Sequence, residues 1–145
     1  MNVLVDTSVW SLALRRAPHH RSQAEQSVVA ELAELIDEGR AKLIGLIRQE
    51  LLSGIRNPSQ FEKLRQRLRP FSDEQVEIYD YEAAAAMGNQ CRMRGLAISP
   101  ADMLVCAVAE SRGWAVYSTG ADFQRYATVL PIQLHTVRST VRGPR

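Results

Sequence analysis

The chain opens with Val3-Leu4-Val5-Asp6-Thr7-Ser8, three apolar residues followed by a carboxylate and two hydroxyl side chains. The apolar run predicts a short buried strand, with Asp6 at its carboxyl end. In an open parallel sheet, ligands bind outside the carboxyl ends of the strands. Asp6 can also cap the helix expected to start near Ser8. Because Thr7 and Ser8 can provide that cap themselves, we expect Asp6 to have a functional role.

Further along the chain, predicted helices end at glycine and lead into apolar stretches. Residues 25–38 end before Gly39, residues 81–94 before Gly95, and residues 101–112 before Gly113. Glycine accepts the left-handed conformation that ends many helices. Apolar stretches follow at 42–46 and 114–117, and a last strand is expected at 132–134. This alternation predicts an α/β fold with a mostly parallel sheet and helices on both faces.

The bulk composition is that of one compact soluble domain. The chain has 145 residues, of which 46% are hydrophobic and 23% charged, a size and balance that suit a single core. We expect the domain to cover residues 1–137, with a loose polar tail at 138–145. No run is long enough to span a membrane, and no signal-peptide pattern is present. Cys91 and Cys106 are predicted to be core thiols, so we expect a cytoplasmic protein.

The positive charge of the chain is small but unusual in kind. The net charge of +2 does not by itself indicate nucleic-acid binding, yet 16 of the 18 basic residues are arginine. Arginine binds phosphate in a two-pronged manner, although arginine-rich codon usage explains the same composition. Residues 56–69 concentrate this charge: Asn57-Pro58-Ser59 predicts a turn and helix cap, and a helix with four basic residues follows. That helix is either a solvated face or a basic arm for RNA or a protein partner.

Three further acids occur in contexts that resemble that of Asp6. Asp102 lies in the first turn of a helix that Ser99 and Pro100 begin, where the helix dipole favours a negative charge. That helix is apolar on nearly all sides from 103 to 109 and is therefore predicted to be buried. Glu50 follows the second strand at the expected beginning of another helix. Asp122 follows the strand at 116–118, where capping a short helix explains it equally well.

Carboxylates that different segments bring to one edge of a sheet form a small, strongly negative pocket. The usual reason to keep such a pocket is a divalent cation, since hard cations prefer carboxylate oxygens. The acids at 6, 50, 102 and 122 therefore support the hypothesis of a metal-dependent hydrolase of phosphodiesters.

These segments resemble the PIN-domain ribonucleases, and among them the VapC-type toxins of bacterial toxin–antitoxin systems. The opening strand with Asp6 is similar to the family's first motif, and Glu50-Leu51 with Gly54 to its second. Ala101-Asp102, the apolar helix and Arg112-Gly113 resemble the third motif, and residues 118–123 the fourth. The motifs occur in order over nearly the whole length. The resemblance implies a PIN-like three-layer α/β/α sandwich with a mostly parallel central sheet.

The resemblance also implies an activity, a cofactor and partners. It implies cleavage of RNA that depends on Mg²⁺ or Mn²⁺, with Asp6, Glu50, Asp102 and Asp122 as catalytic and metal-binding residues. It implies a homodimer and a cognate VapB-like antitoxin whose tail blocks the site. Gly120 departs from the pattern, because the family commonly has an acid or asparagine there. Either Asp122 replaces that residue or three acids suffice, and one or two cations remain open.

Two other functions are weighed against the nuclease. A phosphatase or receiver domain needs a second Asp two residues after the first and a later lysine. Ser8 stands at that place, and lysine occurs only at positions 42 and 63, which argues against this class. A degenerate PIN-like module that binds RNA or a partner without catalysis stays as the alternative. His19, His20 and His135 lie in predicted loops or near the end, and none is expected to act as a base.

Overall fold

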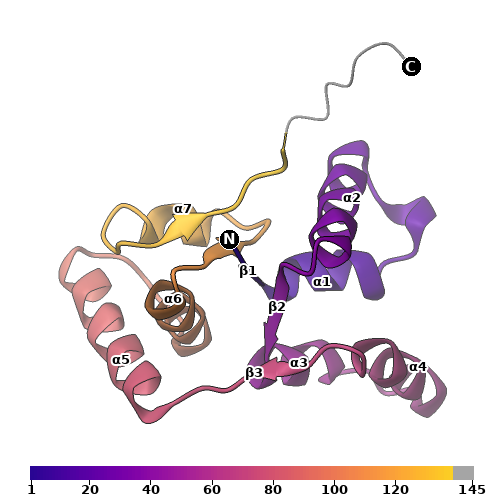
Figure 1. Cartoon of the computed structure of the whole chain (residues 1–145), viewed down its shortest axis with the longest axis horizontal. Coiled ribbons are helices and arrows are strands. Elements are labelled where there is room, and N and C mark those ends of the chain that lie inside the picture. Colours follow the sequence, from indigo (N-terminus) through magenta and orange to yellow (C-terminus); the bar gives the residue numbers. More distant parts are fainter. Residues whose placement is uncertain (139–145) are drawn as a thin grey trace.

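The computed structural model describes residues 1–138, which form a five-stranded sheet in the order β3-β2-β1-β4-β5 (Figure 1). Each neighbouring pair of strands is parallel. The strands are β1 Val3–Val5, β2 Ala41–Ile44, β3 Asp73–Glu74, β4 Ala115–Tyr117 and β5 Gln133–Leu134. The predicted α/β class with a parallel central sheet is therefore confirmed.

Seven α-helices connect these strands within the described residues. They are α1 Thr7–Leu14, α2 Gln23–Asp37, α3 Gly45–Leu52, α4 Pro58–Leu68, α5 Ile78–Met93, α6 Pro100–Arg112 and α7 Asp122–Tyr126. A short 3₁₀ turn, Pro18–His20, precedes α2. Gly39, Gly95 and Gly113 have φ of 70°, 79° and 69°. The predicted ends of α2, α5 and α6 at glycine are therefore confirmed.

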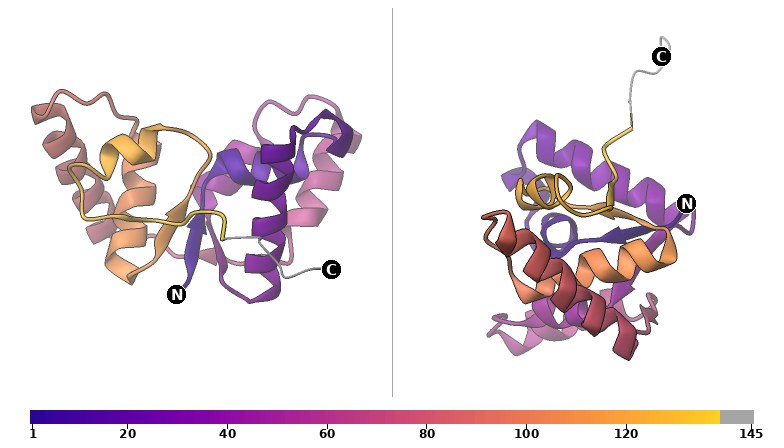
Figure 2. Two further views of the ribbon diagram at one scale, coloured as in Figure 1. Left: turned by 90° about the horizontal axis from the view of Figure 1, so that it is seen from above. Right: turned by 90° about the vertical axis from the view of Figure 1, so that its left-hand side faces the viewer.

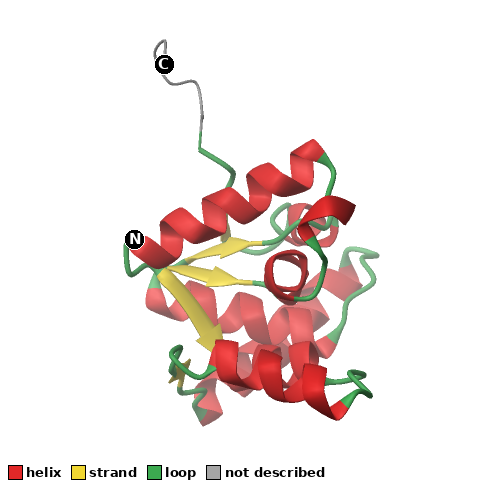
Figure 3. Ribbon diagram, turned by 90° about the vertical axis from the view of Figure 1, so that its right-hand side faces the viewer, coloured by secondary structure: helices red, strands yellow, loops and turns green. Residues whose placement is uncertain are grey.

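The sheet lies between two layers of helices. Helix α2 runs along one face and α5 and α6 along the other (Figure 2), and Figure 3 shows the strands in the middle with helices on both sides. Tyr117 of β4 donates a hydrogen bond from its hydroxyl to the Val28 carbonyl of α2 at 2.9 Å. Seen from above, α1–α4 form one arm of the molecule and α5–α7 the other (Figure 2). The three-layer sandwich is the predicted architecture.

The core explains why the helix that carries Asp102 is positioned so firmly. Every residue from Met103 to Ala109 is buried, as its apolar sequence predicts. Cys91 and Cys106 are buried free thiols of this core. At 25 cal/mol per Å² of apolar surface, burial of such side chains contributes most of the favourable free energy of folding. The first turn of α6 is thus fixed against the sheet by the rest of the helix.

Some boundaries differ from those that the sequence predicts. The apolar stretch at 42–46 is not all strand, because β2 ends at Ile44 and α3 starts at Gly45. Helix α5 starts at Ile78 instead of residue 81, since Glu77 and Asp80 form a reciprocal capping box before it. The two-residue strand β3 has too little sequence to show a period and was not predicted.

The tail predicted at 138–145 lies outside the described residues except for Arg138. The Arg138 side chain forms ion pairs with Glu31 and Glu38 of the α2 segment at 2.7 and 2.9 Å. Among residues 1–138, none of the helices is both long and apolar enough to cross a lipid bilayer.

Candidate functional site

Asp6 lies at the carboxyl end of β1 and is the N-cap of α1. Its Oδ2 accepts hydrogen bonds from the Ser8 amide at 3.4 Å and the Ser8 hydroxyl at 2.8 Å. The expectation that Thr7 and Ser8 cap the helix in its place is wrong, because Thr7 is already the first helical residue. The same Oδ2 also accepts a hydrogen bond from Ser118 at 3.0 Å. One side chain therefore caps α1 and also connects β1 to the segment after β4.

Glu50 is the sixth residue of α3, in its second turn. The prediction that Glu50 begins this helix is wrong, because α3 starts directly after β2, a full turn earlier. The second turn nevertheless brings Glu50 to α1. Its Oε1 accepts a hydrogen bond from the Thr7 hydroxyl at 2.6 Å. Glu50 therefore contacts the residue that follows Asp6 in the sequence, although 43 positions separate the two partners.

Asp102 lies in the first turn of α6, and Ser99 caps this helix as predicted, through the Asp102 amide at 3.1 Å. The Asp102 Oδ2 accepts a hydrogen bond from the Tyr126 hydroxyl at 2.7 Å. Burial raises the pKa of Asp102, and the charges of Asp6 and Asp122 raise it further. The hydrogen bonds from Tyr126 and Ser99 offset only part of this rise. The charge of Asp6 therefore acts on Asp102, although the two residues are far apart in the sequence.

Asp122 is the first residue of α7, and its side chain is 56% exposed. The predicted capping role is wrong, because the N-cap is Ala121, whose methyl group cannot accept a hydrogen bond. Asp122 instead forms an ion pair with Arg125, one turn further along the helix. Its charge still acts on Asp102. We call Asp6, Glu50 and Asp102 the acidic group. Asp122 is the exposed acid at its edge.

Three of the four candidate carboxylates, Asp6, Glu50 and Asp102, are held by hydroxyl groups and not by cations. Within residues 1–138, none of Asp6, Glu50 and Asp102 takes part in an ion pair; serine, threonine and tyrosine hydroxyls bind them. The fully buried acid Asp80 is treated differently, since Arg112 binds it at 2.5 Å. Neutral donors orient a carboxylate and leave its charge uncompensated. The acidic group is thus oriented but still negatively charged.

The sequence did not predict two residues that contact the acidic group, Ser118 and Tyr126. Val5 and Tyr117 are paired in the parallel register of β1 and β4, so the residues after them, Asp6 and Ser118, are neighbours. This contact can be predicted from the sequence only if the pairing of β4 with β1 is already known. Tyr126 lies 24 positions from Asp102 and is buried in the core. Phe123, Val129 and Leu130 lie at helical spacing from it, which is the pattern of an ordinary core residue.

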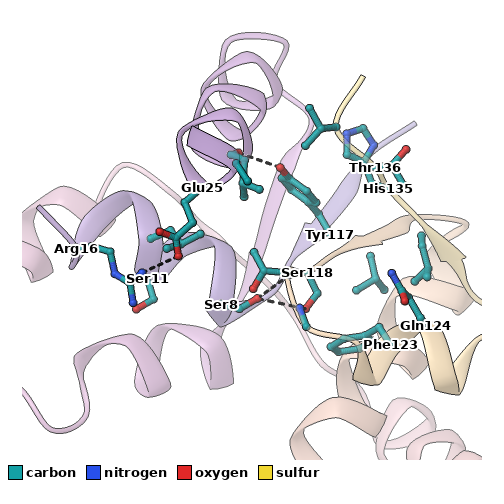
Figure 4. A pocket seen from close by; sticks show the side chains of 18 residues that line it. Ser8, Ser11, Arg16, Glu25, Tyr117, Ser118, Phe123, Gln124, His135 and Thr136 are labelled. Atoms are coloured by element: carbon teal, nitrogen blue, oxygen red, sulfur yellow. Dashed lines mark hydrogen bonds and ion pairs between the residues drawn. The ribbon is translucent and has the colours of Figure 1, made fainter. Parts of the chain in front are cut away.

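A groove borders the acidic group on the side of α2 and α7. Figure 4 shows Ser8 of α1 and Ser118 facing each other at its floor, with oxygens 3.2 Å apart. The Thr119 amide donates to Ser8 Oγ at 3.1 Å. Gln124 and His135 line the groove further out. The His135 imidazole is bound to Glu31 at 2.6 Å, which connects this side of the groove to α2.

The acidic group fits a hard divalent cation in charge and in donor type. Its ligating atoms are carboxylate oxygens, which Mg²⁺ and Mn²⁺ prefer. Burial and the charge of Asp102 raise the pKa of the Cys106 thiol nearby. Burial first, and then the charges of Asp6 and Asp122, raise the pKa of Asp102, and a bound cation opposes both effects because it favours the carboxylate form. As the side chains stand in the described part of the chain, no group of three already surrounds one point.

Comparison with known proteins gives a family and a fold. The model of the PIN domain family matches residues 3–129 of this chain. The structure of FitAcB from Neisseria gonorrhoeae is similar, with 23% sequence identity, 92% of this chain and 96% of the other covered, and a TM-score of 0.73. VapBC2 from Rickettsia felis, bound to a DNA fragment from its promoter, has 14% identity, 93% and 98% coverage, and a TM-score of 0.71. VapBC-1 from nontypeable Haemophilus influenzae has 14% identity, 96% and 100% coverage, and a TM-score of 0.71. No curated protein sequence matches the chain.

Proposed function

This chain belongs to the PIN domain family, and we propose that it is a metal-dependent endoribonuclease, the toxin of a VapBC-type toxin–antitoxin system. The observation that carries the proposal is the group of acids that hydroxyl donors orient without neutralising. Asp6, Glu50 and Asp102 come from three different segments, and each accepts a hydrogen bond from Ser, Thr or Tyr. Oriented negative charge at the carboxyl edge of a parallel sheet suits a divalent cation.

In this proposal Asp6, Glu50 and Asp102 hold Mg²⁺ or Mn²⁺, and Asp122 adds a fourth carboxylate at the open edge. A bound cation supplies Lewis-acid stabilisation of the phosphate and activation of the attacking water. The protein contributes orientation: Ser8 and Ser118 fix Asp6, Thr7 fixes Glu50, and Tyr126 fixes Asp102. Preorganised ligands need no rearrangement as charge develops on the phosphate.

RNA is the proposed substrate, and its hydrolysis adds water across one P–O bond of the backbone. The arginine-rich composition of the chain supports a phosphate-bearing polymer. The test is incubation of the purified chain with single-stranded RNA and Mg²⁺ or Mn²⁺, with EDTA as the metal-free arm. Asp6→Asn and Asp102→Asn are expected to abolish cleavage. Asp37→Asn, an exposed acid at the end of α2, is the matched control.

The outcomes separate the nuclease from its alternative. Cleavage that persists in EDTA or in Asp102→Asn contradicts the proposed site. Calorimetric titration with Mn²⁺ is the second measurement, since it does not depend on the right RNA being supplied. A chain that binds no Mn²⁺ is the non-catalytic RNA-binding or partner-binding module instead.

The proposed protein partner is a VapB-like antitoxin that covers the acidic group. The similar structures named VapBC and FitAcB support this proposal. A small protein encoded by the neighbouring gene, when co-expressed with the chain, is expected to co-purify with it and to suppress its cleavage of RNA. Stoichiometric co-purification with undiminished cleavage contradicts a blocking role.

A homodimer through α5 is the second proposed assembly. Helix α5 exposes Ile78 at 78% and Tyr81 at 57%, beside an apolar groove that Ala85, Gly88 and Met103 line. Exposed apolar surface of this kind marks protein contacts. Light scattering is expected to give a dimer for the wild type and a monomer for Ile78→Arg/Tyr81→Arg. An unchanged mass in that variant rules out this face.

A further inference from the structure

A groove with strong positive charge lies between the end of α1 and the start of α4. Its basic lining residues are Arg15, Arg56, Lys63 and Arg67, and apolar Leu14 and Ile55 lie between them. All four basic side chains are exposed. Of the described residues that line this groove, none is acidic. We call this surface the basic groove.

The charges of the basic groove are not compensated within the molecule. None of its four basic residues forms an ion pair in residues 1–138, and Arg67 reaches only the Leu14 carbonyl, at 3.4 Å. Arg65 on the same helix is different, because Glu62 binds it at 2.8 Å. Lys63 and Arg67 are four positions apart on α4, where like charges destabilise a helix. A groove that concentrates unpaired cations in this way is suited to an anionic ligand.

We propose that the basic groove holds the phosphate backbone of the RNA strand at a distance from the cleavage point. This inference rests on the proposed nuclease function. Helix α1 connects the two places, since Asp6 caps its start and Leu14 ends it. Eight residues of helix span about 12 Å, a distance that a few nucleotides of one strand cover. Both α1 and α4 belong to the same arm of the molecule (Figure 2).

The acidic group itself gives the reason for a separate grip on the substrate. Asp6, Glu50 and Asp102 repel the phosphates of RNA, so affinity has to come from surfaces beyond them. Lysine and arginine that neutralise phosphates supply such affinity without regard to sequence. No aromatic side chain lines the basic groove among the described residues, so it offers no stacking platform for bases. The groove therefore positions the strand and does not select the sequence.

An acidic protein segment is the competing ligand, and the charges favour RNA over it. Three of the four cations are arginines, whose planar fork matches phosphate oxygens two at a time. The groove and Asp6 also lie at opposite ends of α1, so one substrate strand can contact both.

The test measures binding without cleavage, using fluorescence anisotropy of a short mixed-sequence single-stranded RNA. The full chain carries Asp6→Asn, which prevents cleavage in the proposed function, while Asn still caps α1. EDTA is present throughout. The groove variant adds Arg15→Gln, Arg56→Gln and Lys63→Gln. The matched control adds Arg40→Gln, Arg65→Gln and Arg94→Gln, which removes the same charge from elsewhere.

The groove variant is expected to lower the slope of log affinity against log salt by about two, at about 0.7 per lost contact. The control variant is expected to keep most of the slope. Equal slopes in both variants, or no change in either, overturn the inference. The same variants are also titrated with polyglutamate, a model of an acidic protein segment. If the groove variant loses polyglutamate binding while its RNA binding is unchanged, the groove belongs to an acidic protein and the inference is overturned.

The same variants separate this inference from the nuclease proposal. If the groove substitutions weaken RNA binding and the wild-type chain does not cleave RNA with Mg²⁺ or Mn²⁺, the inference stands and the nuclease proposal is refuted. The three groove substitutions are also made on the wild-type background. If this variant cleaves RNA with an unchanged KM, the nuclease proposal stands and the inference about the groove is refuted.

Discussion

Replacement of Asp102 by asparagine separates two effects of this residue: its effect on the stability of the folded protein and its affinity for a cation. The side chain keeps its shape, and Asn Oδ1 can still accept the hydrogen bond that Tyr126 donates at 2.7 Å. The variant loses only the negative charge that Asp6 and Asp122 repel. We therefore expect Asp102→Asn to fold normally, to be at least as stable as the wild type at pH 7, and to lose stabilisation by Mn²⁺.

The pH dependence of this difference follows from the pKa of Asp102, which burial and the neighbouring charges raise. The folded state therefore binds the Asp102 proton more tightly than the unfolded chain, whose pKa is the ordinary 3.8. Stability contributed by the protonated form is lost as the pH rises through the folded pKa. The advantage of the Asn variant is present at pH 7 and disappears as the pH falls toward 3.8.

The stabilisation by Mn²⁺ has a calculable size. A ligand at a hundred times its Kd stabilises the folded state by about 2.7 kcal/mol. For a chain of 145 residues, 1 kcal/mol raises Tm by about 2–4 °C, so the wild type gains about 5–11 °C. Asparagine supplies a neutral amide in place of a charged ligand, so we expect little or no shift in the variant.

Differential scanning fluorimetry with MnCl₂ or EDTA measures both quantities in one series. Asp37→Asn, on the exposed end of α2, is the control and is expected to shift like the wild type. An Asp102→Asn protein that gains as much in Tm as the wild type refutes the reasoning. So does a wild type that Mn²⁺ leaves unchanged at every concentration.

Three further predictions concern neighbouring residues. Tyr126→Phe removes the donor that lowers the pKa of Asp102, so the acid limb of the pH–rate profile for RNA cleavage is expected to move to higher pH; an unmoved limb contradicts this positioning role. Gly120→Asp adds a carboxylate where a Cβ would lie 3.9 Å from its nearest neighbours, so calorimetry is expected to show tighter Mn²⁺ binding than in Gly120→Ala. Asp80→Ala leaves the Arg112 guanidinium, 13% exposed, without its closest partner; urea denaturation is expected to show a loss of about 3 kcal/mol, and a change below 1 kcal/mol is the contrary result.

The sequence predicted the elements whose causes are local. An apolar run followed by Asp6 indicated a buried strand with a carboxylate at its end, because strand burial and chain direction follow from the neighbouring residues alone. Gly39 and Gly113 marked helix ends, because a left-handed residue has few alternatives to glycine. The buried helix after Asp102 was likewise visible as an unbroken apolar run.

Relations between distant segments were not predictable in the same way. The sequence placed Glu50 after a strand, but only the early start of α3 turns this side chain toward Thr7. The contact of Ser118 with Asp6 depends on β4 lying beside β1 in a register that no local pattern records. The hydrogen bond from Tyr126 to Asp102 joins α7 to the start of α6 across 24 positions of the chain. Which hydroxyl group reaches each acid depends on topology, so the sequence indicated candidate acids but not the contacts of Ser118 and Tyr126.

The two ways in which this molecule treats acidic residues bear on function more directly than the acids alone. Glu31 and Asp80 are almost completely buried, and arginine neutralises each of them, because an uncompensated charge in the core is very unfavourable. With 16 arginines available, the chain had the means to neutralise Asp6 and Asp102 as well. Hydroxyl donors there leave the charge uncompensated, and burial, together with the charges of Asp6 and Asp122, raises the pKa of Asp102. The uncompensated acids and the unpaired cations of the basic groove lie toward opposite ends of α1, an arrangement that suits a cation at one end and a polyanion at the other.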